Sequence, residues 1–196
     1  MIYLKLLIIT WCIIVIPLSA SSHNKEQLLY WENISKISKN KILRDSKLDP
    51  IVKYYISNDL KISDNKESLH LLDIITSKST DEIRPLYFHI LNDIVLNSDG
   101  ALSEIIGKYC LTFLITNKLF VINYFIINSK IKTAYAYYIG YEIAYAEQGL
   151  SDNQLTYVDI VTALYKGIKS EKYKTILNDF DSIMLKYINE IKVASQ

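Results

Sequence analysis

Residues 101–129, ALSEIIGKYCLTFLITNKLFVINYFIINS, contain two long apolar runs that meet at Asn117-Lys118. Apolar side chains extend around most of each predicted helix, which is typical of helices at the centre of a domain. A membrane span over residues 109–127 is the alternative, but it would place Lys118 near mid-bilayer at a cost of roughly 2.5 to 3.5 kcal/mol. We therefore expect a helical hairpin in the core and no stable membrane span.

The rest of the chain after residue 24 has the same helical periodicity. Apolar residues recur at spacings of three and four, and no stretch alternates apolar and polar residues between hairpin turns. The pattern predicts an all-α protein of about nine helices, joined by short connections so that neighbours form antiparallel pairs. No repeated residue signature separates an irregular helical domain from a short HEAT-like α-solenoid, so both architectures stay open.

Several local signals predict where helices begin and end. The spacing predicts one amphipathic helix over residues 24–39, and Asp49-Pro50 is an N-cap followed by the proline that first turns favour. Ser79 to Glu82 and Ser151 to Gln154 match the capping box, in which two side chains satisfy the free amides of a first helical turn. Gly100 is expected to end the helix before it in the left-handed conformation.

The first twenty residues have the composition of an export signal. Lys5 precedes the apolar run Leu6–Ile16, and Pro17–Ala20 supply a break and the small residues that a signal peptidase prefers. The run is about half of the roughly 20 apolar residues that a membrane-spanning helix needs. We expect residues 1–20 to be a cleaved signal peptide, residues 21–196 to form a single all-α domain, and the protein to be exported to the periplasm or the extracellular medium.

Charge and cysteine content exclude two further classes of protein. The chain has 22 Lys and Arg residues against 21 Asp and Glu residues, and loss of Lys5 with the signal would make the two numbers equal. Nucleic-acid binding requires a basic excess, so nucleic acid is not an expected partner. Cys110 would be the only cysteine left after cleavage, which excludes an internal disulfide, and its apolar neighbours predict a buried thiol.

Residues 133–148, TAYAYYIGYEIAYAEQ, carry the strongest indication of a binding surface. Residues four apart share one face of a helix, and two such rows lie next to each other here. The small row is Ala136, Gly140 and Ala144, and the aromatic row is Tyr137, Tyr141 and Tyr145. The small row would let another helix approach closely, while the tyrosines would hold a peptide or a sugar ring and Glu142 would set the polar register. The alternative is that the tyrosines are half-buried packing residues.

His89 and Asp93 are the weak candidates for catalysis. They lie four apart on one predicted helix, where they could share a metal ion or form a carboxylate-oriented general base. A metal site needs further ligands, which His70 and Asp73 on another predicted helix could supply, but no HExxH or CxxC motif supports such a site. The simpler prediction is a partly buried His89 paired locally with Asp93. No cofactor or metal is expected.

These features favour an exported helical protein that binds another protein or a peptide through its tyrosine face. Two alternatives stay open. A small envelope inhibitor or immunity-type protein would have the same compact helical fold without catalytic residues. An all-α hydrolase would use His89 and Asp93 with carboxylates from other helices, but the sequence has no nucleophile motif, phosphate loop or cofactor fingerprint. An enzyme is therefore the less favoured class.

Overall fold

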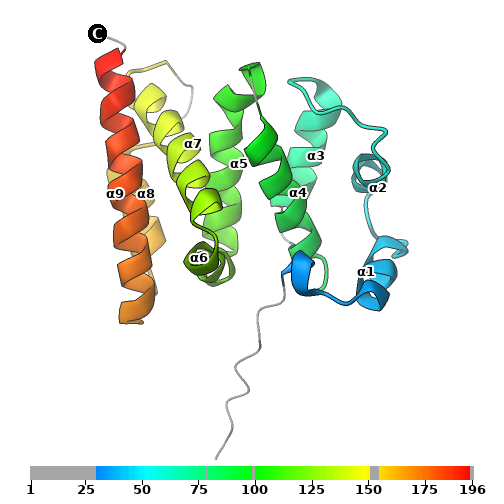
Figure 1. Cartoon of the computed structure of the whole chain (residues 1–196). Coiled ribbons are helices and arrows are strands. Elements are labelled where there is room, and N and C mark those ends of the chain that lie inside the picture. The colour runs from blue at the N-terminus through cyan, green and yellow to red at the C-terminus, as the bar shows by residue number, and fades with distance from the viewer. Residues whose placement is uncertain (1–29, 78, 99, 151–154, 195–196) are drawn as a thin grey trace, which may run out of the picture.

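The computed structural model describes residues 30–77, 79–98, 100–150 and 155–194, and within these ranges every regular element is a helix. The protein is thus all-α, as the periodicity predicted. The described elements are η1 (Trp31–Asn33), α1 (Lys36–Leu43), α2 (Pro50–Ile56), α3 (Lys66–Thr76), α4 (Arg84–Asn97), α5 (Gly100–Thr116), α6 (Lys118–Ile127), α7 (Ser129–Glu147), α8 (Tyr157–Tyr165) and α9 (Glu171–Ala194). Figure 1 shows α3, α4, α5, α7 and α9 side by side, with α6 across one end. The predicted signal peptide lies outside the described residues.

The expected helix over residues 24–39 is wrong for the part of that range that the structure describes. The 3-10 turn η1 ends before Ile34, whose backbone is extended. The side chain of Ser35 accepts a hydrogen bond from the amide of Ser38 and starts a separate helix, α1. Ile37, which the single helix would have placed on its apolar face, is 84% exposed. A local cap therefore outweighs the apolar spacing at this point.

Helices α2 and α3 begin at the residues that cap them. Asp49 accepts a hydrogen bond from the amide of Ile51 at 2.9 Å, and Pro50 occupies the first turn, as predicted. Asn65 accepts from the amide of Ser68 at 2.8 Å and begins α3 after a polar connection. Val52 is the only residue of α2 with a buried side chain, so caps hold this region as much as packing does.

The capping box predicted at Ser79 to Glu82 does not form. Helix α4 begins later, its N-cap Ile83 provides no side-chain hydrogen bond, and the hydroxyl of Ser79 is buried without a partner among the described residues. Pro85 lies in the first turn of α4 instead, where its missing amide costs nothing. The second predicted box, Ser151 to Gln154, lies outside the described residues, and α8 is capped by Thr156.

The two core helices predicted within residues 101–129 are present as α5 and α6, but they do not form an antiparallel hairpin, because the chain bends by 107° between them at Asn117. Gly100 has the expected left-handed conformation, with a φ of +51°, but it begins α5 and does not end α4, because α4 already ends at its C-cap Ser98, whose backbone is extended. In the part of the chain that the structure describes, no single helix is long and apolar enough to cross a membrane. The bent α5–α6 pair is long and apolar enough to cross a membrane only when its two helices are counted as one segment.

Lys118 has a structural role at this bend. Its ammonium donates hydrogen bonds to the carbonyl oxygens of Ala163 at 2.6 Å and Lys166 at 2.9 Å, at the C-terminal end of α8. The last carbonyls of a helix have no intrahelical partner, and a lysine there satisfies them and complements the helix dipole. The charge between the two apolar runs therefore joins α6 to α8.

The most extensive helix–helix interface lies between α7 and α9, and these two helices run parallel. Three contacts show the direction, because their residue numbers rise along both helices. They are Lys132 with Asp179, Gly140 with Met184, and Glu147 with Lys192. The shorter α8 returns the chain between them, because Tyr157 contacts Asp181 while Tyr165 contacts Asn178. The antiparallel α8–α9 pair is therefore combined with the parallel α7–α9 interface.

An aromatic cluster anchors the first described residue to the core. The hydroxyl of Tyr30 donates to the carbonyl oxygen of Phe120 at 3.1 Å, and its ring lies 4.6 Å from that of Tyr124. Phe88 contacts Tyr124 edge to face at 4.9 Å between ring centroids. Pairs of this kind contribute about 0.5 to 1.5 kcal/mol beyond their buried area. The cluster joins the chain before η1 to α4 and α6.

Candidate functional site: a tyrosine groove on α7

The small-residue row of α7 brings α9 close, as its spacing predicted. Ala136 and Ala144 are fully buried. A Cβ atom placed on Gly140 would lie 3.0 Å from the main-chain oxygen of Met184, which is tighter than most carbon contacts. Because the two helices are this close, side chains of α9 also reach the aromatic row of α7.

The aromatic row forms a continuous strip along α7. The rings of Tyr141 and Tyr145 stack at 4.3 Å, and Tyr137 lies 6.5 Å from Tyr141. Tyr137 also meets Tyr187 of α9 edge to face at 5.1 Å. Tyr137 is 37% exposed and the other three are partly buried. The predicted row is therefore both a packing element and a surface, with its most open ring at Tyr137.

A groove of about 470 Å³ begins at this open ring. Tyr137, Tyr138 and Tyr187 form its aromatic side, and the exposed Leu96 at the end of α4 forms part of the opposite side. The hydroxyl of Tyr138 accepts a hydrogen bond from Ser98 at 2.9 Å, which holds that ring in place. We call this hollow the tyrosine groove. Tyr187 belongs to the groove because α9 packs beside α7. The residue spacing within one helix does not reveal this contact.

Glu142 is not on the tyrosine face, and its predicted role in setting the polar register there needs correction. It is 7% exposed and packs against α5, where its Cβ lies 3.1 Å from a Cβ placed on Gly107. The residue directly after Tyr141 turns about 100° around the helix, which directs it into the α5–α7 interface. The polar side chains that line the groove, apart from the tyrosines, are instead those of Ser129, Lys130 and Thr133.

The structure separates the two catalytic candidates. Nδ1 of His89 lies 3.3 Å from a carboxylate oxygen of Glu32, and its ring stacks on Trp31. Asp93 accepts a hydrogen bond from the hydroxyl of Tyr55 at 2.5 Å and another from Asn97 at 3.1 Å. The predicted local pair of His89 with Asp93 is therefore wrong, since each residue has a partner from elsewhere in the chain.

The pKa shifts near His89 and Asp93 are explained by burial and by hydrogen bonds that hold the fold together. The hydrogen bond from His89 lowers the pKa of Glu32, and burial together with Asp93 raises the pKa of Tyr55. Burial likewise raises the pKa of the Cys110 thiol, which is fully buried as predicted. Within the described ranges, no group of three or more His, Cys, Asp or Glu residues is placed to hold a metal ion.

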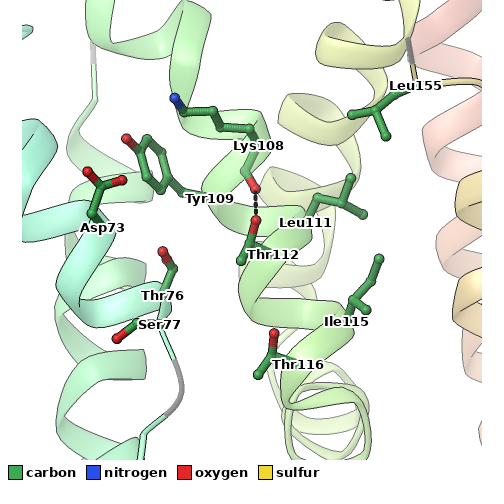
Figure 2. Close-up of a pocket in the computed structure, with 10 residues that line it drawn as sticks. All are labelled: Asp73, Thr76, Ser77, Lys108, Tyr109, Leu111, Thr112, Ile115, Thr116 and Leu155. Atoms are coloured by element: carbon green, nitrogen blue, oxygen red, sulfur yellow. Dashed lines mark hydrogen bonds between the residues drawn. The ribbon is translucent and has the colours of Figure 1, made fainter. Parts of the chain in front are cut away.

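A larger, polar hollow of about 630 Å³ lies between α3 and α5. Figure 2 shows Asp73 of α3 facing the Tyr109 hydroxyl of α5, with Lys108 beside that ring. The ammonium of Lys108 lies 4.7 Å from the ring centroid, and burial followed by the charge of Asp73 raises the pKa of Tyr109 to about 12. The Tyr109 hydroxyl therefore stays protonated at neutral pH, where it cannot act as a general base.

Three of the hydroxyl groups that line this hollow donate hydrogen bonds to carbonyl oxygens of their own helices. Thr76 donates to the carbonyl oxygen of Leu72, and Ser77 donates to that of Ile74. Thr112 donates to the carbonyl oxygen of Lys108, the bond drawn in Figure 2. In this arrangement none of these three hydroxyl groups is paired with a histidine or a carboxylate that would activate it as a nucleophile.

The comparisons with known proteins identify no relative. No protein-family model matches the chain, and neither a curated protein nor a solved structure matches it. The class that the fold defines is an all-α helical domain, and its function has to be inferred from its surface.

Proposed function

We propose that this protein is an exported helical binding protein whose tyrosine groove receives a segment of another protein or a peptide. The observation that carries the proposal is the strip of four tyrosine rings on α7 and α9, which ends at the exposed Tyr137 and Leu96. Tyrosine contributes a large flat contact area and loses little conformational entropy on binding. Hot spots at protein interfaces are enriched in such residues.

The shape of the strip favours an elongated partner segment. Three rings follow one another along α7, Tyr187 adds a fourth from α9, and residues at the end of α4 line the groove at one end of this strip. Their packing against α9 keeps the rings in place before a partner binds, which reduces the entropy cost of association. A partner with an apolar or aromatic anchor would fill the groove between Leu96 and Tyr137.

Capture of the tagged protein from cells of its own source tests the groove. We expect one stoichiometric partner, captured by the wild type and reduced at least about tenfold by Tyr137→Ala, a loss typical of an aromatic hot spot. Tyr187→Ala should have a similar effect. The matched control is Tyr54→Ala, which removes an exposed tyrosine from α2. Partner capture that Tyr137→Ala leaves unchanged would contradict the proposal.

Two further readouts complete this experiment. The melting temperature of each variant separates a lost surface from a lost core, since Tyr137→Ala should melt within a few degrees of the wild type. The intact mass of the captured protein tests export, because cleavage would remove residues 1–20. A single tight partner with enzymatic activity of its own would favour the inhibitor or immunity-type alternative over a general adaptor.

A further inference from the structure

The bend between α5 and α6 encloses a second surface hollow with a different chemical character. It has a volume of about 500 Å³ and lies between the start of α4, the bend at Asn117, and the connection from α8 to α9. Its charged lining residues are Arg84, Lys118 and Lys166, and none of its lining residues is acidic. We call this hollow the cationic corner.

The two lysines of the cationic corner have no ion-pair partner among the described residues. Lys118 is held in place by its hydrogen bonds to the carbonyl oxygens of Ala163 and Lys166. Burial, followed by the nearby charge of Lys166, lowers the pKa of Lys118. The fold therefore holds two positive charges near each other without a carboxylate between them, which is unfavourable unless an anion joins them.

Arg84 adds a donor that nothing in the described structure uses. One end of its guanidinium group forms an ion pair with Asp81, and the group lies over the ring of Phe120. Its Nε atom is buried and has no hydrogen-bond partner among the described residues. Because Nε has almost no solvent-accessible surface, a ligand in the hollow would be held by the terminal N–H groups of Arg84, whose side chain as a whole is 23% exposed.

We propose that the cationic corner binds a phosphate group, with Arg84 and Lys166 as its side-chain donors and Lys118 as a fixed positive charge. A guanidinium group that is already oriented by one carboxylate still presents its remaining N–H donors, and phosphate oxygens match their geometry. The hollow is larger than phosphate alone, so the group would be carried on a larger molecule, either a soluble phosphate ester or a phospholipid headgroup.

Titration of the purified protein with inorganic phosphate at low ionic strength tests the site. We expect saturable NMR shifts of backbone amides at residues 117–120 and 166–168. Lys166→Ala removes an exposed charge without uncapping α8, because only the main-chain oxygen of Lys166 accepts from Lys118. This variant should weaken binding about tenfold, as expected for a lost charge-assisted hydrogen bond. Lys169→Ala is the control, since it removes an exposed lysine from the same connection.

Vesicles separate the two sources of the phosphate group. Lys166-dependent binding to phosphatidylglycerol vesicles, with none to neutral phosphatidylcholine vesicles, would assign a lipid headgroup. Binding of glycerol phosphate without vesicle binding would assign a soluble ester. The proposal is overturned if Lys166→Ala and Lys169→Ala weaken phosphate binding equally, because general surface charge would then explain it, or if no saturable shift occurs at these residues.

Discussion

Helix α7 and the segment from Ser35 to Ile56 are stabilised in different ways. Helix α7 is packed against both α5 and α9, and its buried side includes Tyr135, Ile139 and Ile143. Helix α1 buries none of its side chains, and α2 buries only Val52. Helix α7 is thus held by packing on two sides, whereas the other segment contributes only Leu48 and Val52 as buried core residues and has local hydrogen bonds at its helix ends. Substitutions should therefore affect them through different mechanisms and by different amounts.

The largest effect is expected at Gly107, where α5 meets α7. A Cβ atom at this position would lie 2.3 Å from the main-chain oxygen of Tyr138, so one of the two helices has to move. Gly107→Ala should lower the free energy of unfolding by about 3 kcal/mol, measured by urea denaturation. Gly149→Ala is the control, because a φ of +72° is its only obstacle and the expected cost is about 1 kcal/mol. If both variants lose the same free energy of unfolding, the α5–α7 interface can accommodate an added methyl group at little cost.

A smaller effect is expected at Asp49, the N-cap of α2. Asp49→Ala removes the acceptor for the amide of Ile51 and should lower the free energy of unfolding by about 1 kcal/mol. Asp64→Ala is the control, as an exposed aspartate in the connection before α3. If both variants unfold at the same urea concentration as the wild type, local caps do not limit stability in this segment.

The smallest effect concerns the contact of η1 with α4 and depends on pH. Hydrogen bonding from His89 lowers the pKa of Glu32 below its ordinary value of 4.5. Its stabilising contribution is therefore complete above that value and is lost as the pH falls through the lower pKa of the folded state. Because both side chains are about half exposed, the contribution should stay below about 1 kcal/mol.

Comparison of Glu32→Gln with the wild type measures this contribution. The difference in unfolding free energy should be present at pH 6 and should disappear once the pH is well below the folded-state pKa of Glu32. Added salt should reduce it at pH 6 as well. A difference that is the same at both pH values would assign the effect to packing rather than to charge.

The described helices were largely predictable because their periodicity and end signals are local. Asp49 with Pro50, the left-handed Gly100 and the close approach at Gly140 all follow from residue types within a few positions of one another. The errors arose where two local signals competed. The apolar spacing predicted one helix over residues 24–39, but the cap at Ser35 begins a new helix within that range. The capping box predicted a helix start at Ser79, but α4 begins later, with Pro85 in its first turn.

The candidate sites were predictable only in part, because they combine distant segments. The tyrosine row was visible within α7, but Tyr187 and Leu96 complete the groove from α9 and α4. The cationic corner joins residues of α4, α6 and the connection before α9, with no signal in any single stretch. The basic residues concerned are too far apart in sequence to form a charge run.

The helical character of the protein, the position of its central apolar helices and the residues of α7 that share a face are all readable from residue order, because helical geometry is set by neighbours three and four positions away. The burial of Glu142, the contact of His89 with Glu32 and the parallel course of α7 and α9 became visible in the folded chain alone. These facts depend on contacts between segments tens of residues apart, whose relative placement is decided by the packing of the whole core.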